Sequence, residues 1–351
     1  MSHGGDIYSN KVNIDFSVSL NPFVRDILGN AFDDMLSEAA ERAFKRAGAY
    51  PDPKFEGLRD TLAKAEGVNA DEIVPGNGAS EVLLSAIRSL DPKNVFLPVP
   101  CFTGYEHILK GIRDCKINRF YLKEPFDIDE DLVSFISGSK DDIDLMILTD
   151  PGNPTGKNID ENILEELLKV STEKGIKIIL DESFYYLSKK GAQKKENRVR
   201  KLISGYGDLI IIRSFTKLFA LPGIRMGYAI ADKVLADKIK DHQPEWNLSV
   251  LHEEIMNRLC GLATEDYINR SYRLISRERD RFYEELKRKY EKVCRSDSVY
   301  ITFKAQNDLY QKMLENGILI RDLSDVSGLG QGYYRVAVRK EKEQGIFLRI
   351  G

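Results

Sequence analysis

Directly after an apolar run, the chain reads Arg213-Ser-Phe-Thr-Lys217-Leu-Phe-Ala-Leu-Pro-Gly-Ile-Arg225-Met-Gly-Tyr228. The apolar run predicts a buried strand, so Lys217 stands just past a strand end and Arg225 follows eight residues later. Ligands of an open α/β sheet bind at this edge. A lysine amine can condense with an aldehyde, while hydroxyls and an arginine can hold a phosphate. A surface lysine in a loop is the alternative interpretation, which matching residues elsewhere in the chain make the weaker one.

The region around this stretch, from Asp71 to Ile230, alternates short apolar runs with longer amphipathic stretches, a pattern typical of βαβ units. Strands are predicted at residues 95–97, 117–122, 145–148, 176–180, 209–213 and 226–231. Helices are predicted at residues 79–90 and 159–173, opened by the turns Pro75-Gly-Asn-Gly and Pro154-Thr-Gly. We therefore expect an α/β fold with a mostly parallel central sheet and helices on both faces.

The pattern changes after Trp246. A long charged helix is predicted at about residues 265–291, followed by strand-like segments at residues 299–304, 318–321 and 333–338. These segments predict a second, smaller α+β domain. We assign residues 34–245 to a large domain, and residues 1–33 together with 246–351 to a discontinuous small domain.

Composition excludes several classes of protein. The formal net charge of −3 lacks the basic excess of nucleic-acid-binding proteins, and the basic run at residues 189–201 is expected to be a solvated loop. The four cysteines form no Cys-x-x-Cys pair, which argues against a metal site or a disulfide framework and fits a reducing cytoplasm. The N-terminus does not resemble a signal peptide, and no apolar run approaches the roughly 18 residues of a membrane span. We expect a cytoplasmic protein that acts on a small molecule.

Polar residues follow three successive predicted strands. Asn153 lies in the turn Asp150-Pro-Gly-Asn-Pro-Thr-Gly156, Asp181 ends the run at residues 176–180, and Lys217 follows the next strand. A parallel sheet gathers such residues along one rim. Here an aspartate can keep a pyridine nitrogen protonated and an asparagine amide can face a phenolic oxygen, as pyridoxal phosphate (PLP) requires. A helix cap or metal ligand at Asp181 and a merely structural turn at Asn153 are the alternatives.

A phosphate-binding group is predicted at the start of the helix at residues 79–90, where free amides and the helix dipole suit an anion. The residues expected to surround the phosphate are Gly78, Ala79, Ser80, Ser214, Thr216 and Arg225. Phe102 can stack on a pyridine ring, although an aromatic residue at that place is ordinarily part of the core. In the second domain, Arg321 and Arg335 can bind a substrate carboxylate and a further anion such as a phosphate ester. Ordinary surface ion pairs are the alternative for both.

Together these residues resemble the fold-type I PLP-dependent aminotransferase family (class I/II) over nearly the whole chain. Within it the chain is similar to the histidinol-phosphate aminotransferase branch, and most similar to the threonine-phosphate decarboxylases of corrinoid (cobalamin) biosynthesis. The motifs that carry this resemblance are His3-Gly-Gly, Asp15-Phe-Ser with Asn21-Pro22, Tyr50-Pro-Asp, Gly76-Asn-Gly, Leu180-Asp-Glu-Ser-Phe184, and Ile318-Leu-Ile-Arg321 leading to Gly332-Tyr-Tyr-Arg335-Val-Ala-Val-Arg339.

The resemblance implies catalytic roles for Lys217, as the Schiff-base lysine, and for Asp181, as the partner of the ring nitrogen. It implies that Asn153 donates to the phenolic oxygen, and that the cofactor phosphate is bound by Ala79, Ser80, Ser214 and Arg225. The tyrosine that matches Tyr50 reaches the cofactor phosphate of a neighbouring subunit in these enzymes, which implies a homodimer with shared sites.

The resemblance also implies a substrate site. Arg335 matches the arginine that binds the substrate carboxylate, whereas His3, Asn21 and Arg321 match groups around the substrate phosphate. Phe184 departs from the tyrosine that most aminotransferases of this group carry, and the decarboxylase-like members share the phenylalanine.

Three functions therefore stay open at this point. The first is decarboxylation of threonine phosphate, and the second is transamination of histidinol phosphate or another amino acid. They differ in which bond is held perpendicular to the cofactor plane. The third is a PLP-fold regulatory or binding protein that has lost catalysis, which the intact Lys217, Asp181 and Arg225 argue against.

Overall fold

A seven-stranded sheet forms the centre of the larger part of the computed structural model, which describes residues 4–193 and 197–351. Its spatial order is β2-β8-β7-β6-β5-β3-β4. The strands are β2 (Ile73–Asn77), β3 (Asn94–Val99), β4 (Lys116–Tyr121), β5 (Leu145–Thr149), β6 (Lys177–Asp181), β7 (Leu209–Arg213) and β8 (Met226–Ile230). Pairing is parallel from β4 to β7, and β8 is antiparallel to both of its neighbours. The mostly parallel sheet is as predicted.

One predicted turn is a strand. We expected Pro75 and Gly76 to form the turn before a helix, but both lie in β2, which pairs with β8 at the edge of the sheet. Proline cannot donate to a strand ladder, so it is tolerated at an edge, where one side of the strand needs no partner. The sequence pattern missed β2 because a proline and a glycine interrupt its short apolar run.

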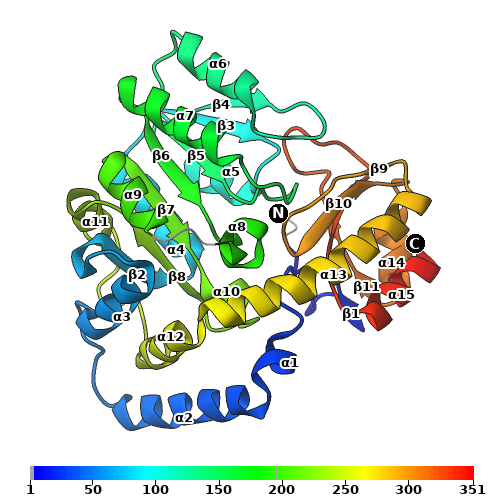
Figure 1. The fold of residues 1–351 in the computed structure, drawn as a ribbon, viewed down its shortest axis with the longest axis horizontal. Helices are drawn as coiled ribbons and strands as arrows, with labels where there is room; N and C mark the ends of the chain where they lie inside the picture. The colour runs from blue at the N-terminus through cyan, green and yellow to red at the C-terminus, as the bar shows by residue number, and fades with distance from the viewer. Residues whose placement is uncertain (1–3, 194–196) are drawn as a thin grey trace.

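Helices cover both faces of this sheet (Figure 1). Along β7, Leu209 and Ile211 belong to one apolar cluster and Ile210 and Ile212 to another, because successive side chains of a strand point to opposite faces. The elements of this part are α3 (Glu56–Glu66), η1 (Ala70–Glu72), α4 (Ala79–Leu90), α5 (Thr103–Leu109), α6 (Glu130–Gly138), α7 (Glu161–Glu173), η2 (Tyr185–Leu187), α8 (Lys189–Ala192), α9 (Arg198–Gly205), α10 (Phe215–Leu218), α11 (Lys233–Lys240) and α12 (Val250–Leu262).

The smaller part contains a four-stranded antiparallel sheet and a short parallel pair. The first has the order β12 (Arg321–Asp322), β13 (Tyr333–Ala337), β10 (Tyr300–Lys304) and β9 (Lys292–Val293). The second joins β1 (Ile14–Asp15) to β11 (Ile318–Leu319), so the N-terminal segment packs on the C-terminal region. The helices here are α13 (Glu265–Lys289), α14 (Leu309–Glu315) and α15 (Glu341–Ile350).

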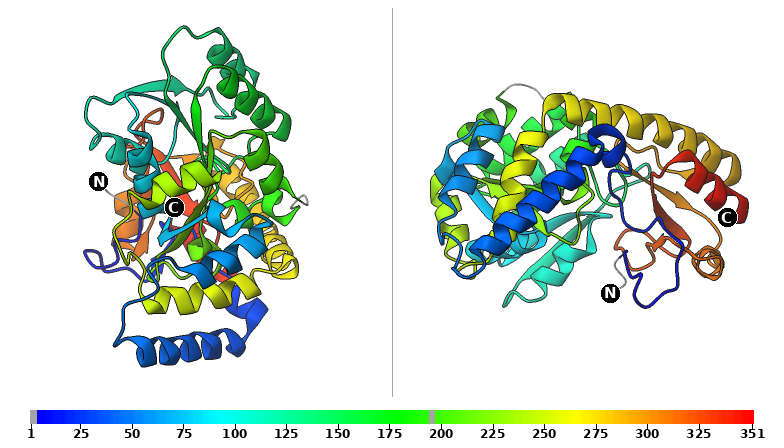
Figure 2. Two further views of the ribbon diagram at one scale, coloured as in Figure 1. Left: turned by 90° about the vertical axis from the view of Figure 1, so that its left-hand side faces the viewer. Right: turned by 90° about the horizontal axis from the view of Figure 1, so that it is seen from below.

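One long helix links the parts, and a second helix packs on the larger part. Helix α13 contacts α8 and η2 near one end and β9, β10 and α15 elsewhere, and Figure 2 shows it extending along the molecule. Helix α2 (Asn30–Arg46), which follows α1 (Val24–Leu28), packs on α12 through an ion pair of Arg46 with Glu253. The division into residues 34–245 and the remainder stays a prediction.

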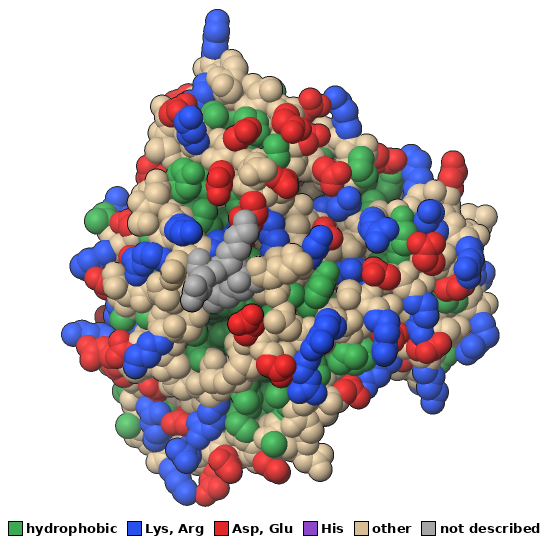
Figure 3. All heavy atoms as spheres, in the orientation of Figure 1, with side chains coloured by type: hydrophobic (Ala, Val, Ile, Leu, Met, Phe, Trp, Pro, Cys, Tyr) green, Lys and Arg blue, Asp and Glu red, His purple; other side chains and the backbone are tan. Residues whose placement is uncertain are grey.

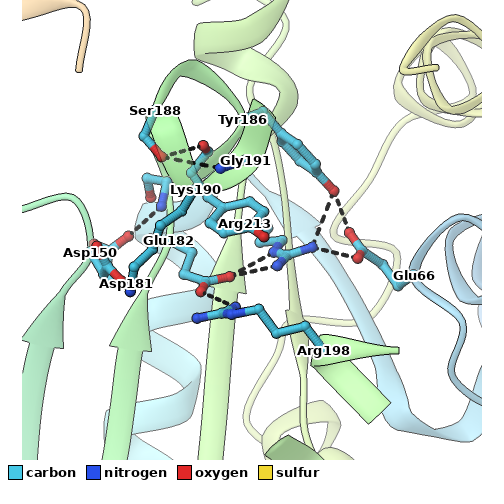
Figure 4. A network of polar contacts seen from close by, with 12 residues as sticks. Glu66, Asp150, Asp181, Glu182, Tyr186, Ser188, Lys190, Gly191, Arg198 and Arg213 are labelled. Atoms are coloured by element: carbon cyan, nitrogen blue, oxygen red, sulfur yellow. Dashed lines mark hydrogen bonds and ion pairs between the residues drawn. The ribbon is translucent and has the colours of Figure 1, made fainter. Parts of the chain in front are cut away.

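The basic run at residues 189–201 does not form a simple solvated loop. Its described residues contribute to α8 and α9, and they place Lys190 and Arg198 in ion pairs. Lys190 contacts Asp150 at 2.8 Å, and Arg198 contacts Glu182 at 2.7 Å (Figure 4). The expectation was wrong because the acidic partners lie far away in sequence and only the fold brings them together.

Charges of both signs are interspersed on the face drawn in Figure 3. Within residues 4–193 and 197–351, no helix is both long and apolar enough to cross a membrane.

Candidate active site

A cavity of about 350 Å³ opens at the C-terminal ends of the parallel strands, and residues from both parts of the molecule line it. The predicted site residues that line it are Ala79, Ser80, Phe102, Asn153, Asp181, Ser214, Thr216, Lys217, Arg225, Arg321 and Arg335. The fold thus brings together residues that the sequence spreads over more than two hundred positions.

Lys217 lies in α10, a single helical turn directly after β7. The Ser214 hydroxyl caps this turn by accepting a hydrogen bond from the Thr216 amide at 3.1 Å. Burial, together with the positive charges of Arg335 and Arg225, lowers the pKa of Lys217 to about 8, although Asp181 acts in the opposite sense. A buried lysine with a lowered pKa is partly neutral near physiological pH, so its amine can act as a nucleophile and as a base.

Asn21 does not line the cavity, in contrast to the expectation. Its backbone amide donates to the carbonyl of Lys217 at 3.0 Å, and its side chain donates to the carbonyl of Leu218 at 3.1 Å. The same side chain contacts the Ser271 hydroxyl at 3.0 Å. Asn21 is buried, and these bonds hold the turn that carries Lys217 against α13. Its role in this structure is to position the lysine.

The carboxylate of Asp181 is held by two donors. The Ser183 amide donates to one oxygen at 2.9 Å, and the Tyr105 hydroxyl donates to the other at 2.7 Å. Tyr105 is fully buried, and burial raises the pKa of its phenol well above the ordinary value, so the phenol stays protonated and acts as a donor. Its oxygen also lies 2.8 Å from that of Thr149. The sequence analysis missed Tyr105, although it stands three residues after Phe102 in a predicted site segment.

The predicted phosphate-binding residues meet at the start of α4. Ala79 and Ser80 form its first turn, so their amides have no acceptor within the helix. Gly78 precedes them with φ 82°, and a Cβ built on it would lie 2.8 Å from the guanidinium of Arg225. Arg225 itself has φ 61°, a left-handed conformation that is costly for a residue with a side chain. The backbone therefore brings this guanidinium directly beside the free amides, as an anion site requires.

Phe102 lies across the start of α5, edge-on to Tyr105 at 5.5 Å between ring centroids. A side chain at Gly104 would collide with the Phe102 ring, since its Cβ would lie 2.2 Å from a ring carbon. The glycine therefore lets the ring lie close to the helix while it faces the cavity.

Arg335 is half-buried and has no acidic side chain bonded to it among the described residues. It donates to the side-chain oxygen of Asn153 and to the carbonyl of Ser17, and its guanidinium lies 5.2 Å from the ring centre of Tyr300. Within the part of the chain that the structure describes, its Nε has no hydrogen-bond acceptor. Desolvation lowers the pKa of Arg335 to about 10, with a smaller contribution from the charge of Arg321. Such a cation is expected to bind an anion in the cavity, because a charge that is partly removed from water and lacks a partner of opposite sign is costly.

Phe184 presents a hydrocarbon ring, which carries no hydroxyl group, to Lys217. The lysine Nζ lies 5.6 Å from the centre of the Phe184 ring. The nearby Tyr300 packs edge-on against that ring, but its hydroxyl donates to the carbonyl of Gly152 at 2.8 Å. The apolar ring of Phe184 therefore forms this wall of the site.

Three further residues complete the comparison with the sequence. Ser19, which the sequence analysis missed, is buried in the cavity wall, and its hydroxyl has no hydrogen-bond partner among residues 4–193 and 197–351. Tyr50 lies on the surface, with 79% of its area exposed, and packs on Trp246 at 4.8 Å between ring centroids. His3 lies outside the described residues.

The donor set fits pyridoxal phosphate. Lys217 offers an amine with a lowered pKa, Asp181 a fixed carboxylate, and the start of α4 with Arg225 an anion site. Phe102 supplies an aromatic face in the same cavity. An aldehyde, a pyridine nitrogen, a phosphate and a ring face are the groups that these residues would hold.

A family model described as aminotransferase class I and II matches residues 14–346 of the chain. A relative from Caldanaerobacter subterraneus, provisionally named threonine-phosphate decarboxylase, is 28% identical over 84% of this chain and 80% of its own length. The adenosylcobalamin biosynthesis bifunctional protein CobDQ of Leptospira interrogans is 26% identical over 97% of this chain, which spans 39% of that protein. The solved histidinol-phosphate aminotransferase of Clostridium acetobutylicum has a TM-score of 0.83 and 32% identity, covering 96% of this chain and 98% of that one.

Proposed function

Because this chain belongs to the class I and II aminotransferase family, and is therefore a PLP-dependent enzyme, we propose that it decarboxylates L-threonine O-3-phosphate. Family membership makes it an enzyme of the aminotransferase and decarboxylase kind, so the regulatory interpretation is not retained. The substrate and the choice of reaction are the proposal.

The observation that carries the proposal is the pair of arginines in one cavity, of which Arg321 is buried and Arg335 half-buried. Arg335 has an unsatisfied Nε and no bonded carboxylate among the described residues, and Arg321 lines the same cavity from β12. A substrate with a carboxylate at one end and a phosphate at the other uses both arginines at once. Histidinol phosphate carries a phosphate but no carboxylate, so it leaves Arg335 without an anion.

Pyridoxal phosphate, when bound, withdraws electrons from the α-carbon of an amino acid. Lys217 would hold the cofactor aldehyde, and Asp181, fixed by Tyr105, would face the ring nitrogen. Arg335 would bind the substrate carboxylate and fix its direction, which decides which bond breaks. A substrate amine that takes the place of Lys217 at the cofactor aldehyde would free the lysine. When the carboxylate then leaves as carbon dioxide, the ammonium form of Lys217 would supply the proton that replaces it on the α-carbon. A pKa of about 8 suits this transfer near neutral pH.

Phe184 supports decarboxylation over transamination. Its ring places a hydrocarbon wall beside Lys217, and Tyr300, whose ring packs edge-on against that of Phe184, is bonded to the Gly152 carbonyl. Among the described residues the lysine thus has no phenolic hydrogen-bond partner, so its protonation depends on burial, Asp181 and the arginines.

Transamination is the second candidate, favoured by the 32% identity to the histidinol-phosphate aminotransferase of Clostridium acetobutylicum. In that reaction Arg335 and Arg321 would bind the two carboxylates of a dicarboxylate partner in the second half-reaction.

A homodimer with shared active sites is part of the proposal. Tyr50 is largely exposed and is not among the residues that line the active-site cavity of its own chain, and its ring packs on that of Trp246. An exposed pair of aromatic rings suits a contact with a second copy of the chain.

The test mixes the PLP-loaded enzyme with O-phospho-L-threonine and measures carbon dioxide and aminopropanol phosphate. We expect both products in equal amounts, and no conversion of histidinol phosphate with 2-oxoglutarate. Absence of carbon dioxide together with turnover of histidinol phosphate would overturn the decarboxylase proposal in favour of the second candidate.

A further inference from the structure

Arg321 already has an acidic partner inside its own chain. One terminal nitrogen of its guanidinium contacts both carboxylate oxygens of Asp325, at 2.8 and 3.0 Å. The other terminal nitrogen donates to the backbone carbonyl of Asp322 at 2.5 Å. Both terminal nitrogens of a cavity arginine are therefore bonded within the loop that follows β12.

The other two cavity arginines differ in this respect. Among the described residues, no acidic side chain is bonded to Arg335 or to Arg225, whose contacts are with neutral groups. These two positions are therefore ready to accept an anion, whereas an anion that approaches Arg321 must compete with the carboxylate of Asp325.

The carboxylate of Asp325 has room to leave. The side chain of Asp325 keeps 35% of its area exposed, whereas that of Arg321 keeps 7%. Asp325 lines a second cavity of about 220 Å³, whose walls also include Lys110, His107 and Glu106. The carboxylate of Glu106 is paired with Arg119. A displaced Asp325 carboxylate can therefore turn to water and toward Lys110, so the exchange leaves no buried charge without a partner.

The loop that carries Asp325 is fixed by contacts on both sides of the Arg321–Asp325 ion pair. The Ser327 hydroxyl donates to Glu106 of α5 at 2.7 Å, and Leu323 and Val326 line the main cavity. A Cβ on Gly328 would lie 3.1 Å from backbone atoms of Val99 and Pro100, so the loop packs closely on the end of β3. An exchange of partners at Arg321 can therefore proceed by rotation of the Asp325 side chain while the backbone stays in place.

We propose that Asp325 is an intramolecular competitor for Arg321: the distal anionic group of the substrate displaces its carboxylate, and this exchange sets the affinity for that group. The inference rests on the proposed function in taking the distal group to be an anion such as a phosphate ester. Removing the competitor strengthens anion binding, because the ligand then no longer has to break an existing ion pair.

The test compares Asp325→Asn with the wild type, both loaded with cofactor. We expect the dissociation constant of inorganic phosphate, measured by calorimetry, to fall about two- to fivefold, as for the loss of a partly exposed ion pair. The KM for the phosphorylated substrate is expected to fall by the same factor. Tighter phosphate binding in the variant indicates competition, because damage to the site would weaken phosphate binding.

Asp322→Asn is the matched control, because it removes the same charge from the same loop. The Asp322 side chain accepts from the Ser324 amide at 2.8 Å and does not contact the guanidinium. In an Arg321→Gln background, Asp325→Asn is expected to have no effect on phosphate affinity. Unchanged or weaker phosphate binding in Asp325→Asn, or equal tightening in Asp322→Asn, would overturn the inference.

The two proposals fail in different ways. If the wild type converts neither phosphorylated substrate, the proposed function fails, while the calorimetric comparison with inorganic phosphate still decides the role of Asp325. If the wild type converts O-phosphothreonine but Asp325→Asn binds phosphate no more tightly, only the inference about Asp325 fails.

Discussion

Two groups of charges lie on either side of the same strand ends, and they differ in how their charges are balanced. A largely buried network, most of which Figure 4 shows, alternates acidic and basic groups along one chain of contacts: Glu66, Arg213, Glu182, Arg198, Glu161, Lys190 and Asp150. In the cavity, Lys217, Arg225 and Arg335 are accompanied, among the described residues, by a single carboxylate, that of Asp181, which is bonded to Tyr105. We call the first group closed, because each of its charges has a partner of opposite sign within the chain. We call the second group open, because its positive charges lack such partners in the part of the chain that the structure describes.

The two groups are built from neighbouring residues. Asp181 lines the cavity, while Glu182, the next residue, bonds Arg198 and Arg213 behind it. Likewise Arg213 ends β7 within the network, and Ser214 faces the cavity. Successive side chains of an extended segment point in opposite directions, so one strand end serves both. The comparison indicates that the network fixes the backbone from which the cofactor residues extend.

The largest expected effect comes from the open group. Lys217→Ala should lower kcat by about a thousandfold or more, because in the proposed function it removes both the amine that would hold the cofactor and the proton donor. Turnover of O-phosphothreonine and covalent trapping of the cofactor by borohydride check this. Covalent attachment that persists in the variant would contradict the assignment of the lysine.

Removing a charge from the closed group should lower the free energy of unfolding. Glu182→Gln leaves Arg213, which is fully buried, short of a negative charge, and should lower the free energy of unfolding by about 3 kcal/mol or more. Urea denaturation of the ligand-free protein measures this difference. A variant as stable as the wild type would show that the network does not hold the strand ends.

The same kind of change in the open group should not destabilise the protein. Arg335→Met removes a half-buried cation whose hydrogen-bond partners are neutral, so the free energy of unfolding should stay within about 1 kcal/mol of the wild type or rise. The KM for O-phosphothreonine should rise about thirtyfold or more, since a charge-assisted contact with the carboxylate is lost. Denaturation and steady-state kinetics on one preparation separate the two effects. Strong destabilisation would show that Arg335 is a structural charge like Arg213.

The smallest expected effect is a dependence on pH. Lys217 reacts as the neutral amine, and its pKa of about 8 makes the rate at which ligand-free protein captures pyridoxal phosphate rise with pH. Between pH 7 and 9 the neutral fraction grows about tenfold. Folding lowers this pKa, so the unfolded chain binds more protons and stability also rises as pH passes upward through 8. A capture rate that stays flat over this range would contradict the lowered pKa.

Much of the open group could be predicted from the sequence. Asn153, Asp181 and Lys217 follow successive strands, and a parallel sheet gathers such positions by its topology alone. The start of α4 was predicted at the residue where it occurs. These predictions succeeded because each depends on local pattern and strand order.

The closed group and parts of the substrate site could not be predicted. Asn21 and Ser19 lie two residues apart in one motif, yet Asn21 holds the Lys217 turn and Ser19 lines the cavity. The basic residues Lys190 and Arg198 looked like a solvated run until the fold supplied their acidic partners. Side-chain direction and long-range pairing decide these roles, and neither has a local signal.

The sequence by itself thus determined the chemistry: a lysine, an aspartate and an anion site at the edge of a mostly parallel sheet. Only the tertiary structure decided the charge balance: among the described residues it bonds no acidic side chain to Arg335, while it pairs Arg321 with Asp325. The physical reason is that residue type and strand order are encoded locally, whereas the free energy of a charge depends on burial and on partners that only folding brings within bonding distance.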